Sequence, residues 1–168
     1  MKKLGTLAAL VLAFLLVGIA PAFAAGNDYP YANAGTGATD PWGMTERECT
    51  SFVAWRSHQA GHNIPGTTGG YGAWAADRWD DNAALLHKKV DHTATVGGFA
   101  QWNANERRDY TYQGRTFSMI AGHEGHIAYV ASVNSDGTVT LQDYNWFGGP
   151  RTYGTDTLPA TAVPRYIH

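Results

Sequence analysis

The chain carries two β-rich runs in succession, residues 126–133 (HIAYVASV) and 138–145 (TVTLQDYN), which residues 134–137 (NSDG) join. A short polar linker that ends in Asp-Gly between two such runs is typical of a β-hairpin. If the last residue of the first run pairs with the first residue of the second, His126 lies opposite Asn145. Asp143 then lies on the same face, one diagonal step away. We therefore predict that one imidazole has a carboxylate and an amide within reach.

Helical patterns precede these strands. The clearest helix is expected over residues 45–60, where Thr45 and Glu48 have the spacing of a capping box. One face of this helix carries Cys49, Phe52, Val53 and Arg56. Residues 72–80 are expected to form a second, short helix. Because helices come first and a strand meander follows, we predict an α+β fold with N-terminal helices packed on an antiparallel β-sheet.

Weaker patterns predict the rest of the sheet. Residues 96–102 form one candidate strand, and residues 103–114 are expected to be a polar loop or a short hairpin. Later strands are expected over residues 151–153 and 163–167. Pro164 has no backbone N–H to donate, so the last of these strands is predicted to lie at a sheet edge.

The first residues have the composition of an export signal. Lys2 and Lys3 precede an apolar stretch over residues 4–19, and Ala22-Phe23-Ala24 matches a cleavage site. After it, the sequence contains no second apolar stretch of membrane-spanning length. We therefore predict a secretory signal peptide at residues 1–24, a secreted protein, and no membrane association after cleavage.

The remaining chain has the length of one domain with one core. Residues 25–40 are rich in Gly, Ala, Asn and Thr, so we expect an extended lead-in before one domain over residues 41–168. The net charge of −2 and the absence of a basic run from the sequence argue against a nucleic-acid partner. A single cysteine allows no internal disulfide, and we expect a monomer stabilised by packing.

Cys49 is that single cysteine, and an unpaired thiol in a secreted protein is a candidate for reactivity. The predicted helix puts Cys49 about four residues inside its N-terminus, where partial positive charge and free N–H groups favour the thiolate. A nearby imidazole would complete the activation. The adjacent Glu48 would oppose ionisation of the thiol, unless its side chain folds back as the capping-box acceptor.

Five segments, in this order, resemble the CHAP domain, the cysteine, histidine-dependent amidohydrolase/peptidase family. They are residues 48–56 (ECTSFVAWR), 76–79 (ADRW), 96–102 (VGGFAQW), 125–130 (GHIAYV) and 143–145 (DYN). The resemblance covers nearly the whole chain after residue 40 and implies a papain-like fold. It also implies that Cys49 is the nucleophile, His126 the general base and Asp143 the third catalytic residue. Asn145 matches a polar position that orients the histidine or the substrate.

Members of this family cut peptidoglycan. The resemblance therefore implies a secreted hydrolase that acts either as an N-acetylmuramoyl-L-alanine amidase or as an endopeptidase of the stem peptide or cross-bridge. Two alternatives stay open: a non-catalytic wall-binding module with the same fold, and a secreted cysteine peptidase or toxin with a protein substrate. The complete set of Cys49, His126 and Asp143 argues against a module that only binds.

Two aromatic residues are candidates for substrate contact. Trp146 follows the segment that holds Asp143, which makes it the better candidate for a groove wall that stacks on sugar or peptide, and Trp42 is the second. His123 and His126 have an H-x-x-H spacing, but a zinc site needs a third ligand and a helix to present the pair. We predict no metal site and no cofactor.

Overall fold

The computed structural model of the 168-residue chain describes residues 26–61 and 75–168. The predicted signal peptide, residues 1–24, lies outside the described residues, as do residues 72–74 of the second predicted helix. In the two described ranges, no helix is long and apolar enough to cross a membrane.

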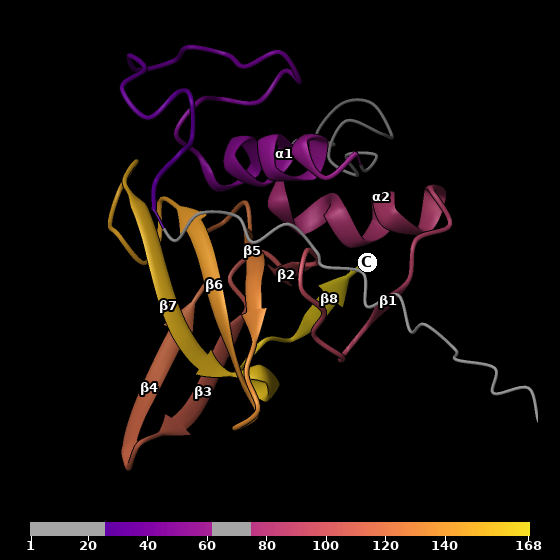
Figure 1. The fold of residues 1–168 in the computed structure, drawn as a ribbon, viewed down its shortest axis with the longest axis vertical. Coiled ribbons are helices and arrows are strands. Elements are labelled where there is room, and N and C mark those ends of the chain that lie inside the picture. Colours follow the sequence, from indigo (N-terminus) through magenta and orange to yellow (C-terminus); the bar gives the residue numbers. More distant parts are fainter. Residues whose placement is uncertain (1–25, 62–74) are drawn as a thin grey trace, which may run out of the picture.

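Helices come first in the chain and strands follow (Figure 1). The helical elements are α1 (Cys49–Gln59), the 3-10 helix η2 (Ala76–Arg78), α2 (Trp79–Leu85) and a late 3-10 helix η3 (Ala160–Ala162). The strands are β1 (Val90–Asp91), β2 (Phe99–Trp102), β3 (Arg107–Tyr112), β4 (Arg115–Ile120), β5 (His126–Val133), β6 (Thr138–Tyr144), β7 (Tyr153–Pro159) and β8 (Arg165–Ile167). The predicted α+β class is confirmed.

Six strands form one antiparallel sheet in the order β1-β8-β2-β5-β6-β7, while β3 and β4 form a separate hairpin. Figure 1 shows α1 and α2 together on one side and the β3–β4 hairpin pointing away from them. The helix α1 packs on β5 and β6, two neighbouring strands inside the sheet.

The predicted β5–β6 hairpin is confirmed, with one change in register. Tyr129 pairs with Gln142 as predicted, but the register shifts by one residue between Val130 and Ser132. Such a bulge leaves one residue of a strand without an opposite partner. It lies on the turn side of the hairpin, so Tyr129–Gln142 and Val130–Leu141 keep the predicted register. The predicted pairing of His126 with Asn145 is not formed in the sheet, because β6 ends at Tyr144.

Other predicted elements need correction. Residues 103–114 are expected from the sequence to be a loop or a short hairpin, but they supply only β3. This strand pairs with β4, and Gln113 and Gly114 form the turn between them. Both turn residues have positive φ, 50° and 73°, as a tight two-residue hairpin turn requires. The edge position predicted for the last strand is wrong, because β8 lies between β1 and β2. Pro164 precedes β8 and therefore removes no hydrogen bond from the sheet.

The start of α1 also differs from the prediction. The helix begins at Cys49, and the side chain of Glu48 makes no capping hydrogen bond, so the capping box is wrong. The preceding segment turns instead around Asp40, whose Oδ1 accepts the backbone N–H groups of Trp42 and Met44. Arg47 has a φ of 65°, which breaks the helical conformation just before α1.

The segment before α1 packs into the core. Tyr29 is 3% exposed and contacts the rings of Phe52 and Trp55, at centroid distances of 5.7 and 5.6 Å. Its hydroxyl bonds to Ser51 on α1, and burial raises the pKa of Tyr29 to about 12. The lead-in therefore fixes the position of α1 rather than only running along the surface of the domain.

A partly buried ion pair reinforces the same contact. The guanidinium of Arg56 on α1 is fully buried, and its Nη2 lies 2.7 Å from Oδ1 of Asp28. Nη2 also donates to Oε1 of Gln142 on β6, at 3.1 Å. The group lies over the ring of Trp55, 4.4 Å from its centroid. Arg56 thus connects the lead-in, the helix and the sheet.

Candidate active site

Cys49 is the first residue of α1, at the end where the backbone N–H groups have no partners within the helix. The thiol is free, and the residue is 9% exposed. The sequence predicts a position about four residues inside the helix, whereas the structure puts Cys49 at the terminus. Because the partial positive charge of a helix is concentrated in its first turn, Cys49 lies where that charge is strongest.

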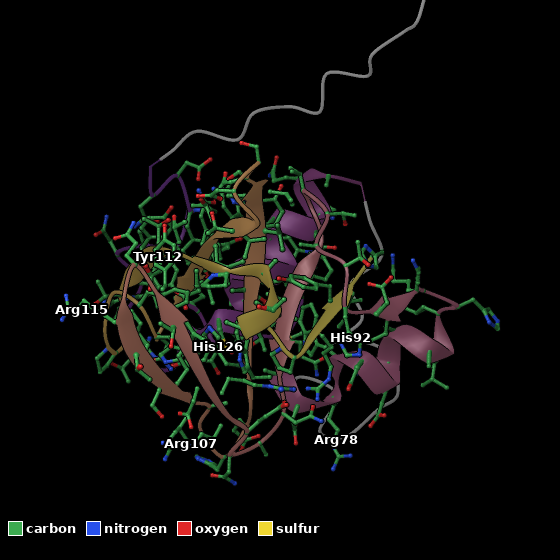
Figure 2. The ribbon with its side chains drawn as sticks, turned by 90° about the horizontal axis from the view of Figure 1, so that it is seen from below. Arg78, His92, Arg107, Tyr112, Arg115 and His126 are labelled. Carbon is green, nitrogen blue, oxygen red and sulfur yellow. The ribbon has the colours of Figure 1, made fainter. Side chains whose placement is uncertain are left out.

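His126 is the first residue of β5, and its ring reaches β6. Its Nε2 lies 2.8 Å from Oδ2 of Asp143, which is fully buried. Cys49 and His126 line the same cavity and are close enough for the charge of Cys49 to act on the imidazole, whose Nδ1 is the ring nitrogen not bonded to Asp143. Figure 2 shows His126 inside the molecule, whereas Arg107 and Arg115 lie at its periphery. The diagonal proximity of His126 and Asp143 predicted from the hairpin is confirmed.

The charges of this group favour a protonated imidazole. Burial alone would lower the pKa of His126, because it disfavours the imidazolium. The charge of Cys49 and the hydrogen bond to Asp143 outweigh burial and raise the pKa of His126 to about 9. Burial raises the pKa of Asp143, and its hydrogen bond with His126 opposes that rise. With a pKa of about 9, the imidazole of His126 is therefore protonated at neutral pH.

A cavity of about 680 Å³ opens beside Cys49 and His126. One wall comes from residues 43–45 and from Glu48, and the other comes from residues 120–125, between β4 and β5. Ala75, Ala76, Thr50, Asn145 and Trp146 complete the lining. The small residues leave the thiol and the imidazole accessible from one open space.

The two tryptophans of the sequence prediction lie in different places. Trp146 lines the cavity, and its ring packs edge-on against His126 with centroids 4.1 Å apart. It also contacts Trp102 and stacks on Phe147, at 5.0 and 5.5 Å. The ring of Trp42 instead packs against His58 on α1, at 5.4 Å, and Trp42 is not among the residues lining the cavity. Trp146 is therefore the tryptophan that can both cover the imidazole and meet a ligand.

Asn145 lines the cavity, but its side chain is engaged elsewhere. Its Nδ2 donates to Oε2 of Glu48, and its Oδ1 accepts the backbone N–H of Arg151 at 2.9 Å. Arg151 in turn donates to Oε1 of Glu48 at 3.2 Å. The sequence analysis missed Arg151, because no local pattern relates it to a residue that precedes it by 103 positions.

The two histidines of the H-x-x-H pair lie in different surroundings. His123 is 86% exposed at its side chain and lies 3.3 Å from Glu124, whereas the ring of His126 is buried against Asp143. Within residues 26–61 and 75–168, no group of three His, Cys, Asp or Glu side chains could hold a metal ion.

Gly125 holds the strand start in place, and here a side chain cannot be accommodated. Its φ is 75°, and an added Cβ would lie 2.6 Å from the carbonyl oxygen of Trp102 and 2.8 Å from the backbone nitrogen of Asp77. We expect Gly125→Ala to lower the free energy of unfolding by about 2 kcal/mol and to displace His126. Gly122→Ala is the matched control in the same loop, because its Cβ would meet nothing within 4 Å. Urea unfolding of both variants checks this; equal stabilities would contradict it.

The α+β fold brings Cys49, His126 and Asp143 together at one site. The family model of the CHAP domain matches residues 39–145. The chain therefore belongs to the CHAP domain family, and the resemblance found in its sequence is confirmed.

Known relatives carry the same domain in longer chains. Over 93 residues, the chain is 32% identical to an N-acetylmuramoyl-L-alanine amidase of Staphylococcus epidermidis, which covers 55% of the chain and 24% of the relative. Over 129 residues, it is 30% identical to an N-acetylmuramoyl-L-alanine amidase of Staphylococcus aureus, which covers 76% of the chain and 31% of the relative. The chain thus spans between a quarter and a third of the length of these relatives.

A solved structure is also similar. The crystal structure of an N-acetylmuramoyl-L-alanine amidase from Staphylococcus aureus matches with a TM-score of 0.55 and 28% sequence identity. The match covers 72% of this chain and 30% of that one. The likeness therefore extends to the backbone of most of the domain.

Proposed function

We propose that this protein is a secreted peptidoglycan hydrolase, an N-acetylmuramoyl-L-alanine amidase that uses Cys49 as its nucleophile. The observation that carries the proposal is the placement of His126 between Cys49 and Asp143 at the wall of one cavity. The relatives' names favour the amidase over the stem or cross-bridge endopeptidase. We further propose that the protein acts as a monomer outside the cell, at the cell wall.

In the proposed reaction, the Cys49 thiolate attacks the carbonyl carbon of the amide and forms a tetrahedral intermediate. The backbone N–H of Cys49, at the start of α1, can donate to the oxyanion. As the carbon–nitrogen bond breaks, His126 gives its proton to the leaving amine, which leaves a thioester on Cys49. Water then attacks the thioester while His126 takes its proton, and the carboxylate product leaves with the thiolate restored. Asp143 holds the imidazole ring in position throughout.

The remaining residues of the sequence prediction receive different roles. We assign Trp146 to covering the imidazole and contacting the substrate, since it touches both the cavity and His126. Asn145 acts on the site through Glu48 rather than on the imidazole itself. The role of Trp42 as a second substrate contact stays a prediction.

The experiment is digestion of a purified muropeptide that contains N-acetylmuramic acid and its stem peptide, followed by mass spectrometry of the products. The amidase proposal predicts a free stem peptide with a new N-terminal alanine and an intact glycan. New ends inside the stem or bridge would mean an endopeptidase. Binding without any cleavage would favour the wall-binding module and contradict the proposed hydrolase.

Activity should depend on the protonation of His126. Its folded pKa is raised to about 9, so the imidazolium that pairs with the thiolate is present at neutral pH and is lost as the pH rises through about 9. We expect hydrolysis to fall over that range. Asp143→Asn replaces the carboxylate, which raises this pKa through its charge and its charged hydrogen bond, by a neutral amide, so the fall should begin at lower pH. Rates measured from pH 6 to about 10 check this; superimposable profiles for the two proteins would contradict it.

A further inference from the structure

We propose that Arg151, in the loop between β6 and β7, is a positioning residue that neutralises Glu48 and so keeps the start of α1 favourable to the Cys49 thiolate. The inference rests on the proposed role of Cys49 and extends it to a residue outside the cysteine–histidine–aspartate group. It answers the objection raised by the sequence, that an acidic neighbour opposes ionisation of the thiol.

The contacts place Arg151 over the N-terminal end of α1. Its Nη1 lies 3.2 Å from Oε1 of Glu48, the residue immediately before Cys49. Its Nη2 donates to the backbone carbonyl oxygens of Glu46, at 3.0 Å, and Gly35, at 3.3 Å. The side chains of Arg151 and Glu48 are 23% and 29% exposed, so water screens their interaction only in part. One guanidinium thus connects the carboxylate of Glu48 to the backbone at Gly35 and at Glu46.

The backbone conformation supports this arrangement, both before α1 and in the loop between β6 and β7. Arg47, Asn145 and Arg151 all have positive φ, at 65°, 71° and 53°. Non-glycine residues persist in this region only where the surroundings fix them. Here the fixing contacts connect the residues to one another: Asn145 bonds to Glu48 and to the backbone of Arg151, while Nε of Arg47 donates to the carbonyl oxygen of Arg151 at 3.0 Å. The loop and the helix start therefore form one interlocked unit.

The charge balance at this unit decides its effect on the thiol. Burial raises the pKa of Glu48, and the charge and hydrogen bond of Arg151 oppose that rise. The guanidinium of Arg151, 3.2 Å from the carboxylate, compensates the charge of Glu48, so the helix terminus keeps its positive potential at Cys49. Among the described residues, the other ionisable groups around the cavity and the helix start are Asp40, Glu46, Arg47, His123, Glu124, His126 and Asp143.

Removing Arg151 would leave the carboxylate of Glu48 uncompensated next to the thiol. We expect Arg151→Gln to slow alkylation of Cys49 by iodoacetamide about tenfold at pH 8. Because Glu48 takes up a proton in acid, the deficit should shrink as the pH is lowered. Hydrolysis of peptidoglycan should fall in parallel.

A double-mutant cycle that neutralises both charges separates the electrostatic effect of Arg151 from simple loosening of the loop. Glu48→Gln alone removes the opposing charge, so alkylation should be at least as fast as in the unmodified protein. The double variant Glu48→Gln/Arg151→Gln should return to within about threefold of the unmodified rate, although it still lacks every contact of the guanidinium. Arg115→Gln is the control for the loss of an exposed arginine and should leave both rates unchanged, since Arg115 lies at the turn end of the β3–β4 hairpin and does not line the cavity (Figure 2).

The outcomes distinguish this inference from the proposed function. If the double variant is as slow as Arg151→Gln, Arg151 acts only by holding the loop, and the inference is overturned while the hydrolase stands. If the alkylation rates follow the cycle but no protein releases wall fragments, the electrostatic role stands and the proposed hydrolase fails. If Arg151→Gln alkylates like the unmodified protein at every pH, the inference is wrong.

Discussion

Replacement of Cys49 by alanine should abolish hydrolysis of purified peptidoglycan, with the rate falling by a factor of about 10⁴ or more. The variant loses the only thiol of the chain, so no second cysteine can take over the attack. Its fold should persist, because Cys49 lies at the start of a helix and alanine fills nearly the same space. Loss of turbidity of a wall suspension measures the rate, and thermal unfolding shows whether the fold is kept.

Cys49→Ser is the sharper control, since it keeps a nucleophilic atom of similar size in the same place. A hydroxyl beside an imidazolium is not ionised at neutral pH, so this variant should be almost as inactive as the alanine variant. Substantial hydrolysis by either variant would mean that Cys49 is structural. The wall-binding module or another catalytic group would then have to explain the cavity.

The largest effect on stability is expected from a residue outside the catalytic group. Asp28→Asn should lower the free energy of unfolding by about 2–3 kcal/mol, because the fully buried guanidinium of Arg56 loses its carboxylate, while the 41% exposure of Asp28 reduces the effect through screening by water. Two hydrogen bonds, at 3.1 and 2.7 Å, join these side chains. Chemical denaturation followed by tryptophan fluorescence measures the change.

Asp109→Asn supplies the matched control. Asp109 also pairs with an arginine, Arg107, at 3.0 Å, but both side chains are more than half exposed. An exposed pair contributes little, so this variant should unfold at the same denaturant concentration as the unmodified protein. If Asp28→Asn also unfolds there, the lead-in segment does not stabilise the domain as its contacts indicate.

The central hairpin could be predicted because its signals are local. Residues 126–133 and 138–145 are β-rich, and the polar linker with its Asp-Gly pair specifies a turn between them. Alternation along paired strands then brings His126 and Asp143 together, even though a bulge changes the register near the turn. The order of the elements, with helices before strands, could be predicted from local patterns of the same kind.

Features that depend on distant residues could not be predicted in this way. The spacing of Thr45 and Glu48 satisfies a capping box, but Asp40 turns the preceding segment and Arg151 takes the carboxylate of Glu48. Tertiary contacts thus override a local preference of about 1 kcal/mol. The strand β4 was missed for another reason: its residues are almost all exposed, so no alternation of apolar and polar side chains marks it.

The role of Cys49 is tested most directly by measuring hydrolysis of peptidoglycan against the extent of alkylation by iodoacetamide. Because the chain has one cysteine, the mass of the intact protein reports occupancy of that site without ambiguity. We predict that activity falls in proportion to labelling, reaches zero at one label per chain, and is protected when peptidoglycan fragments fill the cavity. Full hydrolytic activity in a fully labelled protein would contradict the assignment of Cys49 as the nucleophile.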